Sequence, residues 1–241
     1  IPLILGLGCV TMGTLTTRIL GSKRERFIAT TLMAIAVPCS AQIAVIAALM
    51  ARVGAGYAAA YFGLLVAIFV GIGTVLNRIT PGQSTDLLID LPPLRLPRIG
   101  NVAKKTGVKI WGFMREVALF FLAGTALIAL LDVTGALGWI QVAAAPLVVS
   151  WLHLPAEAAT AFVMGFVRRD FGAAGFFTMG LSAPQLLVAM VTITLFVPCA
   201  ASVMVILKER GWRYLTGLLA GSLGVAFLIG GLLARVLEVL A

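Results

Sequence analysis

The sequence is poor in charge. Of its 241 residues, 18 are basic and 9 are acidic, so 11% carry a formal charge, whereas an ordinary soluble domain has about 25%. Hydrophobic residues make up 61%, and the mean hydropathy is +1.10. This balance excludes a disordered chain and most soluble enzymes. It predicts a membrane protein with several spans, because one span needs about 20 apolar residues and the chain offers many more.

Residues with catalytic or metal-binding chemistry are also scarce. The chain has one histidine, His153, and three cysteines, Cys9, Cys39 and Cys199. A histidine-based metal site, a Ser/His/Asp triad, a disulfide framework and an intramembrane hydrolase are therefore not expected. No GxxxxGK(S/T) phosphate-binding loop is present, so we predict that this chain is not itself an enzyme. The chain is already apolar at Ile1 and shows no signal-peptide pattern, which is typical of a piece of a longer protein.

Apolar stretches with few charges divide the chain into predicted membrane spans. They cover residues 27–51, 57–77, 110–131, 138–152, 156–179, 184–207 and 214–233. Pro38 interrupts the first of these and Pro198 the sixth. Residues 1–20 are apolar and glycine-rich but too irregular to predict as a span. For 138–179 two interpretations stay open, a pair of crossings or a re-entrant segment.

Basic residues gather in three segments between the spans. Residues 18–26, 78–109 and 208–213 hold 13 of the 18. Because the cytoplasmic loops of membrane proteins are enriched in Lys and Arg, we place all three on the cytoplasmic side. Segments 78–109 and 208–213 are on the same side only if the chain crosses the membrane an even number of times between residues 109 and 208. The last span, 214–233, then puts the C-terminus outside. The net charge of +9 is thereby explained without a nucleic-acid partner.

A short pattern occurs twice. The chain reads Val37-Pro38-Cys39-Ser40-Ala41 and, 160 residues later, Val197-Pro198-Cys199-Ala200-Ala201. It also places Gly6 and Gly13 in register with Gly165 and Gly172, at an offset of 159. In the topology above, the two proline-broken helices run in opposite directions, a pattern that points to the binding site of a transporter. The predicted fold is an all-α membrane protein, a polytopic helical bundle with two inverted repeats containing proline-broken helices.

The repeated break has a specific chemistry. A proline inside a helix leaves the carbonyl four residues earlier without its usual donor, which here frees the carbonyls of Ala34 and Thr194. Inside a membrane such carbonyls must bind protein, water or an ion. Cys39 and Cys199 begin the half-helix after each break, where the helix dipole favours a thiolate. Two thiols and freed carbonyls suit a borderline or soft divalent metal; the alternative is a proline kink with a small buried cysteine.

Two further residues are candidate ligands. Cys9 lies in a glycine-rich segment, either as a third ligand or on a simple packing face. Asp170 belongs to the cluster Arg168-Arg169-Asp170 inside an apolar stretch, where ionisable residues usually face a pathway or a partner. We predict it to be a hard metal ligand or a counter-ion, and the alternative is a cytoplasmic turn. The lone His153 is predicted to be structural.

Several of these elements together resemble the C-terminal membrane half of ferrous iron transport protein B, the FeoB family. They are Gly6-Leu7-Gly8-Cys9, Thr17-Arg18, Lys23-Arg24-Glu25-Arg26, Pro38-Cys39-Ser40-Ala41-Gln42, Asp90-Leu91-Pro92-Pro93-Leu94-Arg95-Leu96-Pro97, Gly165-Phe166, Arg168-Arg169-Asp170 and Phe196-Val197-Pro198-Cys199-Ala200. Many family members have Gly-Cys-Asn-x-Pro where this chain has Gly8 to Met12, and Lys-Glu where it has Arg169-Asp170. Because of these departures, the family's pattern does not fix the roles of Cys9 and Asp170 in this chain, nor its metal preference.

The resemblance implies two gate repeats, at 1–77 and 156–241, with a Pro-rich basic connector at 78–109 and linking membrane helices at 110–155. It implies a multi-pass transporter of the cell membrane that carries Fe²⁺. Candidate residues along the route are Cys39, Cys199, Cys9 and Asp170. GTP would act only through an N-terminal GTP-binding domain outside this chain. The implied partners are membrane lipid, Fe²⁺, that domain, a small cytoplasmic accessory protein and further copies of the chain.

Two other functions stay open from the residues alone. A gate-type transporter of an organic solute, such as a nucleoside, predicts hydrogen-bonding side chains around the breaks, for which Gln42 and Ser202 are the obvious candidates. A membrane scaffold without transport predicts that both Pro-Cys pairs can be replaced without loss of activity.

Overall fold

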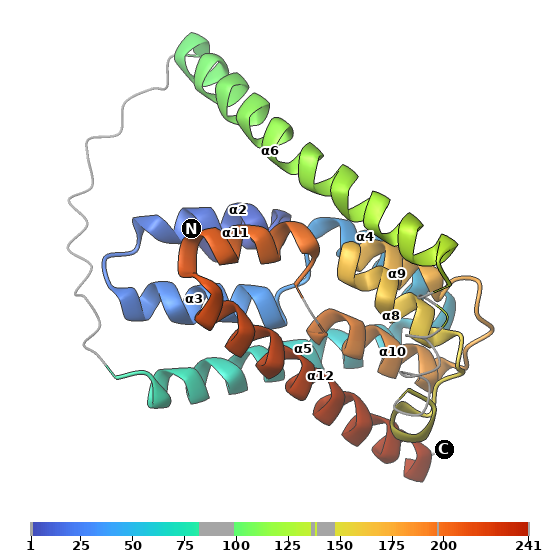
Figure 1. Cartoon of the computed structure of the whole chain (residues 1–241). Coiled ribbons are helices and arrows are strands. Elements are labelled where there is room, and N and C mark those ends of the chain that lie inside the picture. The colour runs from blue at the N-terminus through green and yellow to red at the C-terminus, as the bar shows by residue number, and fades with distance from the viewer. Residues whose placement is uncertain (1, 82–98, 136–137, 139–147, 197, 241) are drawn as a thin grey trace.

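The computed structural model describes residues 2–81, 99–135, 138, 148–196 and 198–240, and all regular structure within these ranges is helical (Figure 1). The elements are α1 (Pro2–Gly8), α2 (Val10–Thr16), the 3-10 turn η1 (Thr17–Ile19), α3 (Lys23–Ala36), α4 (Ser40–Val53), α5 (Ala55–Ile79), α6 (Ile99–Val133), α8 (Ala158–Val167), α9 (Arg169–Gly175), α10 (Ala183–Leu195), α11 (Ala200–Arg210) and α12 (Trp212–Leu240). The predicted all-α fold is confirmed. Most of the predicted connector, and most of the predicted span 138–152, lie outside the described residues.

Among the described residues, four helical stretches are long and apolar enough to cross a membrane. They are Lys23–Val53, Ala55–Ile79, Ala183–Arg210 and Trp212–Glu238. Each contains one of the predicted spans, so the chain is a multi-pass membrane protein, as its composition predicts. The predicted span 110–131 lies inside α6, the long helix that runs along one side of the others in Figure 1.

Both stretches that contain an internal proline are broken at it. Pro38 lies between α3 and α4, and Pro198 lies between α10 and α11. The cause is local, because proline removes a helix hydrogen bond and its ring clashes with the preceding turn. Cys39 and Cys199 are extended residues that directly precede the second halves, as predicted.

The predicted span 156–179 is a helical hairpin rather than one through-going helix, which agrees with the re-entrant interpretation. Its two short helices, α8 and α9, are joined by the extended residue Arg168. Residues 2–16 form a second hairpin of the same kind, in which the extended Cys9 joins α1 to α2. Each hairpin precedes a proline-broken helix.

Matched glycines let the helices of each hairpin approach closely. A Cβ added to Gly172 would lie 2.6 Å from the Cα of Gly165, and one added to Gly13 would lie 2.8 Å from the Cα of Gly6. No side chain fits in such a contact. The glycines that recur at an offset of 159 in the sequence are therefore the residues on which the two hairpins close.

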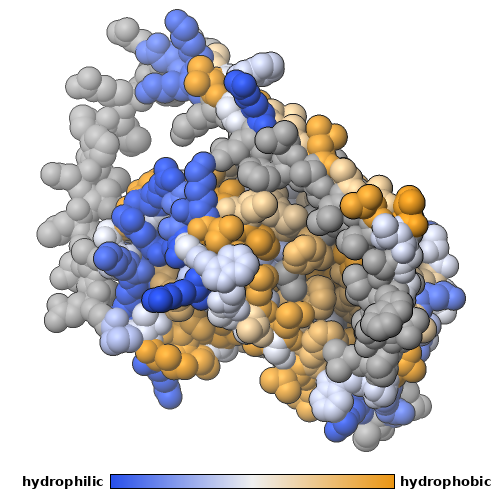
Figure 2. All heavy atoms as spheres, viewed as in Figure 1, coloured by the Kyte–Doolittle hydropathy of each residue, from blue (hydrophilic) through white to orange (hydrophobic). Residues whose placement is uncertain are grey.

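The basic segments meet at one end of the bundle. Arg18 forms an ion pair with Glu209, and its Nε donates to the Glu209 carboxylate at 2.9 Å. Arg24 donates to the carbonyls of Asn77 and Thr80 at 2.8 and 2.9 Å. These contacts join residues 18–26, the start of 78–109 and residues 208–213, which the charge pattern places on one side. Figure 2 shows hydrophilic residues gathered at this end, on the left.

The core surrounds α10. Every residue of this helix from Leu186 to Leu195 is buried, and the helix packs against α3, α5, α8, α9 and α12. The outer faces of α5 and α12 expose large apolar side chains such as Val66 and Leu228. In a membrane these faces would contact lipid, because hydrocarbon is the environment in which such side chains are stable.

Candidate functional site

The tip of the first hairpin contacts both proline breaks. The Ser40 hydroxyl at the start of α4 donates to the Gly8 carbonyl at 2.9 Å. Thr11, at the start of α2, has its hydroxyl 3.3 Å from that of Ser202 in α11, and the Cys199 thiol lies 3.3 Å from the same Ser202 hydroxyl. Thr11 and Ser202 are almost completely buried. The first tip and both breaks therefore share one polar centre.

The tip of the second hairpin reaches the first break through Arg169. This side chain is 4% exposed, and its guanidinium donates to the carbonyl of Ala34 and, at 3.5 Å, to that of Val37. The Ala34 carbonyl is the one that Pro38 frees. The structure thus shows which group satisfies it, namely an arginine from a segment more than 130 residues later in the chain.

Cys39 and Cys199 are free thiols, both partly buried, at the starts of α4 and α11. The charge of Arg169 acts on both thiols, and Cys39 also lies within electrostatic range of Cys199 and Asp170. The structure therefore brings three of the four predicted site residues to one region. Cys9 is the linking residue of the first hairpin and lies beside Gly8, which bonds to Ser40.

Asp170 is paired with its neighbour. Nε and Nη2 of Arg168 donate to the two carboxylate oxygens of Asp170 at 3.1 and 2.8 Å. This is the geometry of a counter-ion. Within the described ranges, no three His, Cys, Asp or Glu side chains are grouped so that they could hold a metal ion. The ligand roles of Cys39, Cys199, Cys9 and Asp170 stay predictions.

A second set of buried polar groups was not predicted as a set. Thr194 of α10 donates its hydroxyl proton to the Met190 carbonyl at 2.7 Å. It therefore accepts from the Gln42 side-chain amide at 3.0 Å and from the Tyr61 hydroxyl at 2.9 Å. The signal in the sequence was Tyr61 itself, because a tyrosine within an apolar span must find a partner for its hydroxyl.

One atom of this set has no hydrogen-bond partner among the described residues. Gln42 is 0% exposed, and its side-chain oxygen Oε1 accepts no hydrogen bond from any described residue. A buried amide oxygen in this condition costs about 1–3 kcal/mol. It is therefore an acceptor that a ligand or water molecule would satisfy.

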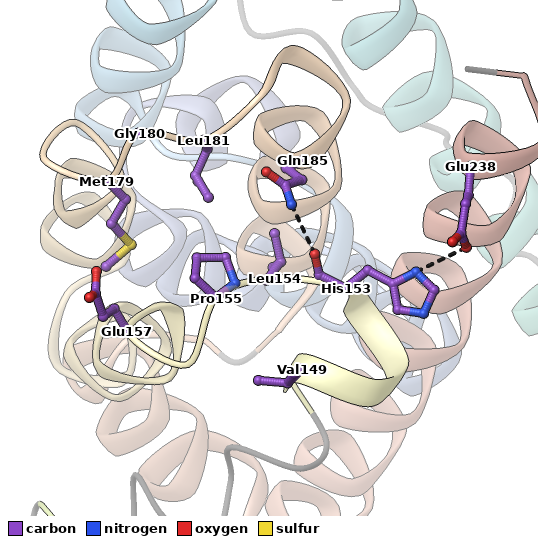
Figure 3. A pocket seen from close by; sticks show the side chains of 10 residues that line it. All are labelled: Val149, His153, Leu154, Pro155, Glu157, Met179, Gly180, Leu181, Gln185 and Glu238. Carbon is purple, nitrogen blue, oxygen red and sulfur yellow. Dashed lines mark hydrogen bonds and ion pairs between the residues drawn. The ribbon is translucent and has the colours of Figure 1, made fainter.

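A cavity of about 660 Å³ lies between the residues that precede α8, the start of α10 and the end of α12 (Figure 3). At one side of it, the side chain of His153 points to Glu238 of α12, with 3.1 Å between Nδ1 and Oε2, and the His153 carbonyl accepts from Gln185 at 3.1 Å. Glu157 and Met179 lie at the opposite wall. The single histidine is thus tied to the end of the last helix and lies apart from the polar centre.

Known families match most of the chain. The family described as "Ferrous iron transport protein B C terminus" matches residues 58–109, and the Gate family, described as "Nucleoside recognition", matches residues 114–213. No GTP-binding domain is among these matches.

Curated relatives are distant but extensive. The chain is 22% identical to the Fe(2+) transporter FeoB of Methanocaldococcus jannaschii, over 89% of this chain and 37% of that protein. It is 26% identical to the Fe(2+) transporter FeoB of Staphylococcus aureus, over 95% of this chain and 39% of that protein. The chain therefore spans less than half the length of these relatives. No solved structure matches it.

Proposed function

We propose that this chain, which carries the FeoB C-terminal and Gate domains and has distant FeoB homologues over most of its length, forms the membrane route of a ferrous-iron transporter. The observation that carries the proposal is the convergence of both hairpin tips on the two proline breaks, with Cys39 and Cys199 beside them. Broken helices that meet inside a membrane are where transporters bind their cargo, because the breaks supply free carbonyls and helix ends.

The arrangement of helices supports an inverted repeat. In each half a hairpin is followed by a broken helix and a long helix. The halves exchange contacts, because α2 of the first hairpin packs on α11 and α9 of the second packs on α4. With residues 2–16 as one re-entrant segment and the whole of 138–179 as the other, two crossings separate residues 109 and 208, and all three basic segments face the cytoplasm. The two halves then have opposite orientations.

The cargo follows from the relatives' names and from the chemistry of the breaks. The relatives are named Fe(2+) transporters, and Fe²⁺ is a borderline ion that accepts both thiolate and oxygen ligands. We assign Cys39 and Cys199 as ligands along the route, with Cys9 as a third and Asp170 as a counter-ion. Fe²⁺ is the transported substrate in this scheme. The further partners that we propose are an N-terminal GTP-binding domain, a small cytoplasmic accessory protein and additional copies of the chain.

Radiolabelled Fe²⁺ uptake by cells that express the full-length protein tests the assignment. The double variant Cys39→Ser/Cys199→Ser should take up Fe²⁺ at least about tenfold more slowly, because hydroxyls are poor ligands for a borderline metal. Thr192→Val is the matched control, since it removes a buried hydroxyl of α10 that donates to the Val188 carbonyl of the same helix. Wild-type uptake in the double variant would refute the ligand roles, and no uptake by the unmodified protein would refute the function.

An organic solute is the second candidate, and the Gln42 side chain favours it. The predicted hydrogen-bonding groups around the breaks are present in larger number than the sequence suggested, with Thr11, Tyr61 and Thr194 beside Gln42 and Ser202. The vacant acceptor of Gln42 would suit the N–H of a nucleobase. A nucleoside that raises the unfolding temperature of the purified protein, and no longer does so in Gln42→Leu, would support this candidate over Fe²⁺.

A further inference from the structure

We propose that the Arg169 guanidinium occupies the cation position at the Pro38 break, and that a transported cation reaches Cys39 and Cys199 only after this side chain has withdrawn. The inference rests on the proposed function for the identity of the cargo. The observed contacts of the Arg169 guanidinium do not depend on which ion is transported.

The surroundings of Arg169 differ from those of an ordinary surface ion pair. The side chain is almost completely buried, and it donates to main-chain carbonyls of Ala34 and Val37. The adjacent carboxylate, Asp170, is held on both oxygens by Arg168. Burying a charge within a membrane protein is costly, so ionisable residues kept there usually lie on an ion pathway.

The groups that hold Arg169 are those that would bind a cation. Carbonyls freed at a helix break coordinate ions in membrane transporters, and the Ala34 carbonyl is freed by Pro38. The charge of Arg169 also acts on both thiols. Two cations cannot occupy this buried site together, because the repulsion between them is strong where water does not screen it. The guanidinium and a divalent ion therefore exclude each other.

The contact joins two separate parts of the fold. Arg169 is the first residue of α9, next to the extended residue Arg168, whereas Ala34 lies in the last turn of α3 and Val37 directly follows that helix. A shift of the hairpin tip relative to α3 would separate the guanidinium from the carbonyls. Arg169 then acts as a tethered competitor that keeps the empty site from attracting unwanted cations.

Cobalt binding to the purified full-length protein tests this competition. Co²⁺ is the probe because it resembles Fe²⁺ in ligand preference and its charge-transfer absorption reports thiolate ligands. The variant Arg169→Gln keeps a hydrogen-bond donor for the carbonyls but removes the charge. It should bind Co²⁺ at least about tenfold more tightly than the unmodified protein. In the unmodified protein Arg169 blocks the site for most of the time, and the apparent affinity falls with the fraction of molecules in which the site is open.

Two further variants make the result specific. Arg52→Gln removes an exposed cation outside the polar centre, which lies over the Phe177 ring at 4.9 Å, and should leave Co²⁺ affinity within about threefold of the unmodified protein. Arg169→Lys keeps the charge and should also stay close to it. In Arg169→Gln the thiolate absorption should disappear when Cys39 and Cys199 are changed to serine.

The opposing result is equally distinct. If Arg169→Gln binds Co²⁺ no more tightly than the unmodified protein, the competition does not exist. If the variant loses its folded state and Co²⁺ does not restore it, Arg169 only joins the hairpin to the break and the proposal is wrong. Failure of Fe²⁺ uptake by the unmodified protein would refute the proposed cargo, whereas the Co²⁺ comparison between variants would still stand.

Discussion

Replacing Gly172 by alanine tests the hairpin that positions Arg169. The added Cβ would lie 2.5 Å from the Ala161 carbonyl oxygen and 2.6 Å from both the Cα of Gly165 and Cδ1 of Ile193. The first two are backbone atoms that cannot rotate away, so α8 and α9 must move apart. Overpacking of this kind costs about 3 kcal/mol at the upper end of its range, and the better helix propensity of alanine offsets about 1 kcal/mol.

The net loss of about 2 kcal/mol should be visible in thermal unfolding. For a chain of this size it lowers the unfolding temperature by roughly 4–8 °C. Gly165→Ala should have a smaller effect, since its closest new contact, at 3.1 Å, is with the flexible Ile193 side chain. Gly71→Ala, in α5 with nothing within 4 Å, should be neutral or slightly stabilising. If Gly172→Ala unfolds at the same temperature as Gly71→Ala, the helices do not pack as described.

Three other predictions concern single interactions. Thr194→Val leaves the buried amide of Gln42 and hydroxyl of Tyr61 without their acceptor, so it should reduce the free energy of unfolding by about 1–3 kcal/mol, more than Tyr61→Phe, as measured by denaturant unfolding. Glu209→Gln removes an ion pair at the solvent-exposed end, so the loss should stay below about 1 kcal/mol and shrink at high salt. Cysteines introduced at Lys208 and Arg235 should react with an impermeant thiol reagent from opposite sides, Lys208 from the cytoplasm; reaction of both from one side would contradict the topology.

Features that depend on local chemistry could be predicted from the sequence. Pro38 and Pro198 break their helices because the cause lies within four residues of each proline. Residues 18–26, the start of 78–109 and residues 208–213 lie at one end of the bundle, as expected if positive charge marks one side of the membrane. The repeat was visible because the same glycines are needed at the same places in both hairpins.

Features that depend on distant contacts could not be predicted. For residues 156–179 the sequence leaves a crossing and a re-entrant segment both open, and the close approach of Gly172 to Gly165 shows the hairpin. The sequence places Arg169 in an ionisable cluster with Asp170, but Arg169 donates to the carbonyls of Ala34 and Val37 at the end of α3 and just after it, and no local pattern indicates these contacts. For Gln42, the sequence suggested a polar group near the break without showing that its oxygen would be buried and vacant.

The two tips are built alike but carry different chemistry, and this asymmetry bears on the proposed transport. At the offset of 159, Val10 of the first hairpin corresponds to Arg169 of the second, and Thr11 corresponds to Asp170. Val10 packs against Met33 and Val37, so the first tip adds an apolar residue where the second adds a cation. An inverted repeat offers a similar path from both sides of the membrane. In the proposed inverted repeat, a cation carried by only one of the two tips would make the path unequal, since a single movement, that of α9, would decide when the thiols accept an ion.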